Sequence, residues 1–262
     1  KWKDLGKHIS NTVVIKEDEK IVASMILKDK EKNVVLFTKN GLTKQVPLSQ
    51  FEVTRYSKPL TAIKLKEDDE LINVSIYKED TLFVTNNGLY LRFKTSEIPV
   101  VGVKASGVKG INLKDDYVIS ASTIKEEDEY LNIYTNLNTG KRLKLTDLVY
   151  ISRAKKGNML FKKAKTKDYK INFAYLTTSR DVNLCKIDND LIEIKNSEIP
   201  IMDINSTGST ITKKRVDLWT LKAEEINLLN REHPKEVSNE SEITKKENEQ
   251  LSFASFVEDF KI

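Results

Sequence analysis

Short stretches of alternating apolar and polar residues recur along this chain, and the first complete one surrounds an Asn-Gly pair. In residues 33–48 the alternation runs on both sides of Asn40-Gly41. Asn-Gly readily adopts the positive φ angles of a type I′ turn, which joins two twisted antiparallel strands. The stretch therefore predicts a β-hairpin.

The hairpin pattern returns three times. We place the further copies at 81–94, 131–145 and 173–187, the last with Ser179-Arg180-Asp181 at its turn. Aligning the four copies on the threonine before each turn gives spacings of 47, 50 and 42 residues. A period of this length is typical of propellers, in which one small sheet is built from each repeat.

A second pattern stands between the hairpins: an apolar pair around a polar residue, a lysine and an acidic turn, at 14–19, 63–69 and 111–116. A new strand is predicted after each of these turns. One blade is therefore interpreted as a strand, a hairpin, a loop and a closing strand. The sequence predicts an all-β, propeller-like ring of about five or six four-stranded blades. The blades are placed at 1–19 (partial), 20–65, 70–113, 117–161 and 170–212.

The repeats stop near residue 217. We hypothesise that Asp217–Leu221 pairs with the partial first blade and closes the ring. Residues 1–222 are thus predicted to form one domain, and residues 223–262 an acidic tail that is mostly disordered because it has little to bury. Phe253, Phe256 and Phe260 in this tail are either a docking motif or incidental aromatic residues of a frayed terminus.

Charge divides between these two parts. Residues 223–262 hold ten acidic and five basic residues, so the tail carries −5; because the whole chain carries +5, residues 1–222 carry +10. A basic body with an acidic tail indicates a polyanionic partner, for which the tail is a possible competitor.

Catalytic chemistry is poorly represented. His8 and His233 stand near no motif, and Cys185 is the single cysteine, for which we expect a buried structural role. Acidic pairs such as Asp68-Asp69 and Asp115-Asp116 sit in predicted turns that recur in each blade, so they are interpreted as solvated turn residues. No nucleotide-binding or metal-binding motif is present, and we expect no cofactor and no metal. With no apolar run long enough for a membrane span, we expect a cytoplasmic protein.

Basic residues recur on the strand after each hairpin turn and in the loop that follows, where Gly, Ser or Pro would let the backbone approach a phosphate. Exposed loops are often basic, but recurrence in three repeats favours a surface for a polyanion. Without a recognition helix or an aromatic platform, contacts should go to the backbone of duplex DNA. The predicted DNA-binding residues are Lys44, Arg55, Lys58, Arg92, Lys94, Lys104, Lys109, Lys141, Arg142, Arg153, Lys155 and Lys156.

Taken together, the T-K-N-G-L and T-N-N-G-L hairpins, the basic loops and the I-x-L-K-x-D-D segments resemble the C-terminal domain of the DNA-cleaving A subunits of bacterial type IIA topoisomerases. The resemblance covers residues 1–222, and the opening residues 1–7 look most like the topoisomerase IV branch of low-GC Gram-positive bacteria. It implies a β-pinwheel, whose blades exchange a strand with their neighbours, and a basic rim that bends DNA and presents it to a catalytic core.

The resemblance also implies partners and limits. The partners are duplex DNA, the rest of the A subunit, and the ATPase B subunit that is reached through it, in a nucleoid-associated enzyme of chromosome segregation. The catalytic tyrosine, magnesium site and ATPase of the family belong to parts absent from this chain, so the fragment is expected to be non-catalytic. The glycine-rich box of gyrase A subunits is missing from 55–59 and 104–108. This favours topoisomerase IV; a DNA-wrapping gyrase domain and a protein-binding propeller stay as alternatives.

Overall fold

The computed structural model describes residues 15–16, 18–25, 33–52, 59–162, 167–188 and 190–222. These residues form antiparallel β-sheets joined by loops and single 3-10 turns, which confirms the all-β prediction. Among them, no helix has the length and apolarity that crossing a membrane requires. The predicted tail, with its phenylalanines, and most of the partial first blade lie outside the described residues.

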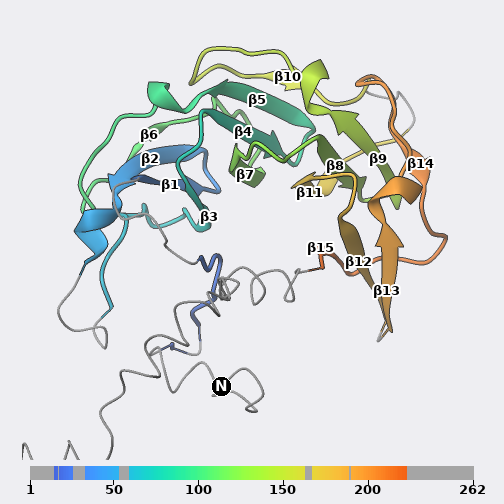
Figure 1. Cartoon of the computed structure of the whole chain (residues 1–262), viewed down its shortest axis with the longest axis horizontal. Coiled ribbons are helices and arrows are strands. Elements are labelled where there is room, and N and C mark those ends of the chain that lie inside the picture. Colours follow the sequence, from blue (N-terminus) through green and yellow to red (C-terminus); the bar gives the residue numbers. More distant parts are fainter. Residues whose placement is uncertain are drawn as a thin grey trace, which may run out of the picture. The chain divides into compact units, whose positions relative to one another are not determined.

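Four sheets follow one another along the described part of the chain (Figure 1). In the first sheet the order is β3-β1-β2-β6, made of β1 (Asn33–Thr38), β2 (Leu42–Pro47), β3 (Leu71–Ile76) and β6 (Val108–Lys109). In the second it is β10-β5-β4-β7, made of β4 (Asp80–Thr85), β5 (Leu89–Lys94), β7 (Val118–Ile124) and β10 (Asn158–Met159).

The third and fourth sheets follow the same plan. The third is ordered β11-β8-β9-β14, from β8 (Tyr130–Thr135), β9 (Thr139–Lys144), β11 (Ile171–Thr177) and β14 (Ser209–Thr210). The fourth is ordered β13-β12-β15, from β12 (Val182–Ile187), β13 (Asp190–Lys195) and β15 (Leu218–Leu221). A 3-10 turn follows each hairpin: η2 (Leu48–Phe51), η3 (Thr95–Glu97), η4 (Leu145–Asp147) and η5 (Asn196–Glu198).

Each four-stranded sheet takes strands from two repeats. β3 precedes the second hairpin and β6 follows it, yet both belong to the first sheet, on opposite sides of the hairpin β1–β2. The strand exchange implied by the resemblance is thereby confirmed. The contiguous stretches 20–65, 70–113, 117–161 and 170–212 are not single blades, because alternation reveals a strand but not the hairpin with which it pairs. The segments 63–66 and 111–114, predicted as closing strands, are not strands.

The fourth hairpin was predicted in the wrong place. Residues 173–177 lie in β11, which pairs with β8 of the third sheet, and the real hairpin joins β12 to β13. Its turn uses Asp188, whose φ is +54°, in place of the Asn-Gly of the first copies. β15, which contains most of the segment 217–221, pairs with β12 in the fourth sheet. Its predicted pairing with the partial first blade stays a prediction, because most of that blade lies outside the described residues.

The acidic turns hold the hairpin turns in place. Asp69 is buried, and its Oδ1 accepts hydrogen bonds from the backbone N–H groups of Asn40 and Glu70, both at 2.9 Å. Asp116 does the same for Asn87, at 3.0 Å. The second aspartate of each pair therefore caps a turn of the neighbouring hairpin, and the prediction of a solvated residue is wrong for Asp69.

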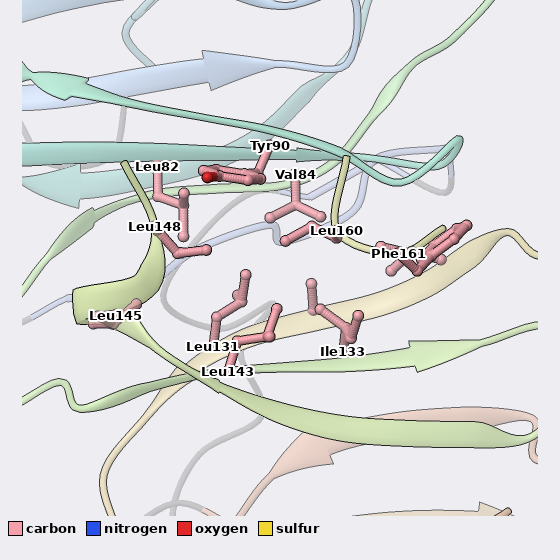
Figure 2. Packing of buried hydrophobic residues seen from close by; sticks show 12 residues of the cluster. Leu82, Val84, Tyr90, Leu131, Ile133, Leu143, Leu145, Leu148, Leu160 and Phe161 are labelled. Carbon is pink, nitrogen blue, oxygen red and sulfur yellow. The ribbon is translucent and has the colours of Figure 1, made fainter. Parts of the chain in front are cut away.

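The core lies between successive sheets. Figure 2 shows Leu82, Val84 and Tyr90 of the second sheet facing Leu131 and Ile133 of the third. Between the third and fourth sheets, the rings of Tyr134 and Trp219 stack at 3.9 Å beside Cys185, whose predicted burial is confirmed. Burial of apolar faces between neighbours holds the sheets together, as in other repeat folds.

Replacing Asp69 by alanine should lower the free energy of unfolding by about 1–3 kcal/mol, because the N–H groups of Asn40 and Glu70 lose their common acceptor at a partly buried site. Asp68→Ala is the matched control, since the adjacent carboxylate is exposed. Urea unfolding followed by circular dichroism measures both. Equal stability of the two variants would contradict the capping role.

Candidate nucleic-acid interface

The segment after each hairpin crosses to the outer edge of the preceding sheet. We call 99–110, 149–160 and 200–210 the first, second and third rim loops. Each begins with a parallel bridge to the preceding sheet: Val100 to Gln45, Tyr150 to Arg92, and Ile201 to Arg142. Each then adds a two-residue strand, β6, β10 or β14, to that sheet. Figure 1 shows these strands on the opposite side of the sheets from β3, β7 and β11.

Glycine is needed in the rim loops for contact with the sheet. Gly107 and Gly157 have φ angles of +92° and +83°. A Cβ at Gly157 would lie 2.2 Å from the carbonyl oxygen of Tyr90, and one at Gly107 would lie 2.7 Å from that of Thr43. The sequence interpretation, which linked these glycines to phosphate, missed this packing role.

Two of the predicted DNA-binding lysines are buried. Lys44 Nζ donates hydrogen bonds to three carbonyl oxygens of the first rim loop, each at 2.9 Å. Lys141 Nζ donates to Leu160 and to two carbonyl oxygens of the third rim loop, at 2.7 and 3.0 Å. Burial lowers the pKa of Lys141 to about 8, although Asp203 acts in the opposite direction. Both side chains have no exposed surface, so the expectation that they contact DNA is wrong.

The residue that follows Lys44 or Lys141 on the return strand, and its equivalent in the second sheet, also binds backbone carbonyl groups of the next repeat. Arg142 is buried, and its Nε donates to Ile199 at 2.6 Å. Arg92 Nη1 donates to Leu145 at 2.6 Å. Gln45 fills the equivalent position, with hydrogen bonds to the carbonyl groups around η3. Arg92 and Arg142 thus hold the following 3-10 turn, a structural role that the sequence interpretation did not include.

Arg92 and Lys94 are also neutralised locally. Asp80 accepts a hydrogen bond from Arg92 at 2.7 Å and one from the Tyr150 hydroxyl, and its Oδ1 lies 2.9 Å from Lys94 Nζ. Burial alone would raise the pKa of Asp80, but the hydrogen bonds from Tyr150, Arg92 and Lys94 outweigh it and lower the pKa. Glu79 Oε2 also lies 3.5 Å from Lys94 Nζ, so two carboxylates face the two cations.

The remaining predicted residues in the described part lie together on the first two rim loops. Lys104, Lys109, Lys155 and Lys156 are exposed, and no carboxylate among the described residues forms an ion pair with them. Arg153, half-buried, donates to the carbonyl oxygen of Lys109 at 2.6 Å and thereby joins the two loops. Arg55 and Lys58 lie outside the described residues.

The two loops make a continuous surface. Ala154 N donates to the carbonyl oxygen of Gly110 at 2.7 Å, and Asn112 N donates to that of Lys155 at 2.9 Å. The third rim loop contains no lysine or arginine. Sequence reasoning missed Lys162, which is exposed two residues after the end of the second loop.

A family model described as the DNA gyrase C-terminal domain, beta-propeller, matches residues 32–78, 79–125 and 134–174, which is more than half of the chain. This chain belongs to that family. The first two matched ranges each contain a hairpin and the following inner strand, which is the unit seen in the first two sheets.

Relatives and solved structures agree with this assignment. The chain is 35% identical over 215 residues to the A subunit of DNA topoisomerase 4 from Bacillus subtilis (strain 168), covering 80% of this chain and 27% of the relative. It is 40% identical over 176 residues to the corresponding protein of Staphylococcus epidermidis, covering 65% and 22%. The chain thus spans about a quarter of the length of these relatives.

Two solved structures share the fold. A C-terminal domain of DNA topoisomerase IV superposes with a TM-score of 0.79 at 32% identity, covering 88% of this chain and 77% of that one. A DNA gyrase A C-terminal domain gives a TM-score of 0.70 at 18% identity, covering 85% and 77%.

Lys141→Met should destabilise the domain by about 1–3 kcal/mol, because three buried carbonyl groups lose their donor. Lys144→Met, at an exposed position of the same strand, is the control and should be nearly neutral. Chemical denaturation at pH 7 measures the difference. If Lys141→Met were as stable as the control, the lysine would not be holding the rim loops.

The cluster around Asp80 predicts a pH dependence of stability. Because the pKa of Asp80 is lowered from 3.8 on folding, its carboxylate stabilises the fold above that pH, and this contribution is lost as the pH falls through the folded pKa. Asp80→Asn should therefore be less stable than the native chain at pH 7, with a gap that narrows below pH 3.8. Denaturation curves at several pH values test this. Glu79→Gln, at an exposed neighbour, should show a much smaller gap; a pH-independent gap for Asp80→Asn would contradict the ion pair.

Proposed function

We propose that this chain is the DNA-binding and DNA-bending C-terminal domain of a topoisomerase IV A subunit. The observation that carries the proposal is the joined surface of the first two rim loops, where Lys104, Lys109, Lys155 and Lys156 are exposed and form no ion pair within the described part of the chain. Ammonium groups on flexible stems bind phosphate as point charges, so the surface suits a nucleic-acid backbone.

Backbone contact with little base readout fits the rest of the described chain. These residues contain no α-helix that would enter a groove. Specificity in such a complex comes from the shape and bendability of the duplex.

The arrangement of the sheets supports bending. The inner strands β3, β7 and β11 of successive sheets contact each other, and the rim loops lie on the far side (Figure 1). A duplex that follows rim loops of successive sheets is therefore led around a convex surface. Smooth bending of a short site by 40–90° costs about 1–6 kcal/mol, which the phosphate contacts must offset.

The relatives support a proposal for the role in the whole enzyme. We infer that the domain is non-catalytic and presents a duplex to the catalytic core for relaxation and decatenation during chromosome segregation. Its partners are then the rest of the A subunit, and the ATPase B subunit that is reached through it, in the cytoplasm at the nucleoid. A gyrase A role is the alternative within the family, since that fold is shared too.

One observation favours a second candidate, a protein-binding surface. Val100, Tyr150 and Ile201 hold equivalent rim positions and are 53%, 50% and 45% exposed. Such apolar side chains suit a protein partner. Salt separates the two functions, because an apolar interface is far less sensitive to it than phosphate contact.

Reversing two rim charges should weaken duplex binding. We expect Lys109→Glu with Lys155→Glu to lower affinity for a 60 bp duplex at 100 mM salt by about tenfold or more, and to reduce the log–log salt slope by about 2. Fluorescence anisotropy measures both quantities.

The control pair is Lys78→Glu with Lys125→Glu, at the opposite end of the strands from the hairpin turns. It has the same change in net charge and should lose much less affinity. If both pairs lost equally, binding would reflect overall charge, and the rim surface would be rejected.

A further inference from the structure

The structure carries a second basic surface, at the hairpin-turn end of the third sheet. Four joining segments, 64–70, 111–117, 161–170 and 211–217, precede β3, β7, β11 and β15 in the sequence. Their described residues, which in the third segment are 161–162 and 167–170, lie at the turn ends of the sheets. Because they hold equivalent places in the repeat, their charges can be compared directly.

The sign of the charge changes along the chain. Segment 64–70 has four acidic residues against two lysines, and 111–117 has two aspartates against one lysine. Segment 161–170 has five lysines against one aspartate, and 211–217 has three basic residues against one aspartate. The turn ends of the first two sheets are thus acidic or mixed, whereas basic segments flank that of the third.

Both basic segments are tied to the same hairpin turn. Asn136 Nδ2 donates to the carbonyl oxygen of Asp168 at 3.0 Å, and Asn138 Nδ2 donates to that of Lys214 at 2.8 Å. The asparagines of the first two turns, Asn40 and Asn87, also donate to backbone carbonyl oxygens, but there an aspartate carboxylate additionally accepts the backbone N–H of the asparagine. Among the described residues, no carboxylate accepts a hydrogen bond from the third turn, so this turn is held by carbonyl groups of segments that carry lysine and arginine.

The cations at this end are presented to solvent. The exposed basic side chains of the two segments, among the described residues, are Lys162, Lys167, Lys213, Lys214 and Arg215. Lys162 lies beside the third rim loop, since its N–H donates to the carbonyl oxygen of Asn205 at 3.0 Å. A group of this charge attracts a polyanion rather than an apolar partner.

The rim itself does not continue the phosphate surface past the second loop. The third rim loop has no basic residue, and it exposes Asp203. Asp203 would repel a DNA backbone that continued from the second rim loop onto the third. Lys162 provides a positive charge beside the third rim loop, towards the turn end of the sheet.

We propose that the turn end of the third sheet is a second phosphate-binding surface, which takes the duplex as it leaves the second rim loop. The inference rests on the proposed function, because it continues the path of the same duplex. The bound DNA would then leave the plane of the rim and follow an oblique path, so that the domain imposes writhe as well as bending.

The test compares two pairs of substitutions at equivalent joining segments. Lys213→Glu with Lys214→Glu changes the basic turn end, and Lys66→Glu with Lys114→Glu makes the same change in charge at exposed positions of the first two joining segments. Anisotropy with a 60 bp duplex at 100 mM salt should show a loss of about tenfold for the first pair, with a salt slope lower by about 2. The second pair should lose less than about threefold.

The rim pair Lys109→Glu with Lys155→Glu is measured in the same assay to separate the two proposals. If the rim pair weakens binding and the Lys213/Lys214 pair binds like the native chain, the inference is overturned and the proposed function stands. If neither pair weakens binding, both are overturned. Lys213→Gln with Lys214→Gln, which removes charge without reversing it, should give a smaller loss of the same kind; no loss in a variant with native circular dichroism also overturns the inference.

Discussion

The structure depends on one kind of contact: buried side-chain donors of a return strand bind backbone carbonyl groups of the following repeat. Lys44, Lys141, Arg142, Arg92 and Gln45 all do this, and each ties a rim loop or a 3-10 turn to the preceding sheet. A buried ammonium group is costly to desolvate, and at Lys44 and Lys141 hydrogen bonds to three carbonyl oxygens compensate for that cost. Because each sheet is completed by the next repeat, the repeats interlock.

The interlocking decides where charge is available for function. The basic side chains of the return strands, such as Lys44 and Lys141, were predicted to face DNA, but they form hydrogen bonds inside the fold. The exposed lysines lie instead on the rim loops that these side chains bind. Ala154, Arg153 and Asn112 then connect the first two rim loops through backbone carbonyl groups. The proposed DNA surface is thus a fixed arrangement of loops, and its curvature follows from contacts between the inner strands.

The sequence predicted the all-β repeat and the family because Asn-Gly turns, alternation and period are local signals. It did not reveal with which hairpin an inner strand pairs, because the alternation of apolar and polar residues in a strand is the same whichever hairpin the strand joins. The fourth hairpin was misplaced because Asp188 provides a turn without Asn-Gly. Of the proposed contacts, Lys104, Lys109, Lys155 and Lys156 are exposed as a phosphate contact requires, whereas Lys44 and Lys141 are buried. The sequence near a lysine does not show whether the side chain is buried. Most of the carbonyl groups that bind Lys44 and Lys141 belong to residues more than fifty positions away.

The central claim is that loops held on a convex set of sheets bend a duplex by its backbone. Its most direct test is the end-to-end distance of a 60 bp duplex, measured by energy transfer between dyes at its two ends as protein is added. We expect the ends to approach each other on binding, with the change lost in the Lys109→Glu/Lys155→Glu variant at matched occupancy. Saturated binding that leaves the end-to-end distance unchanged would contradict the account.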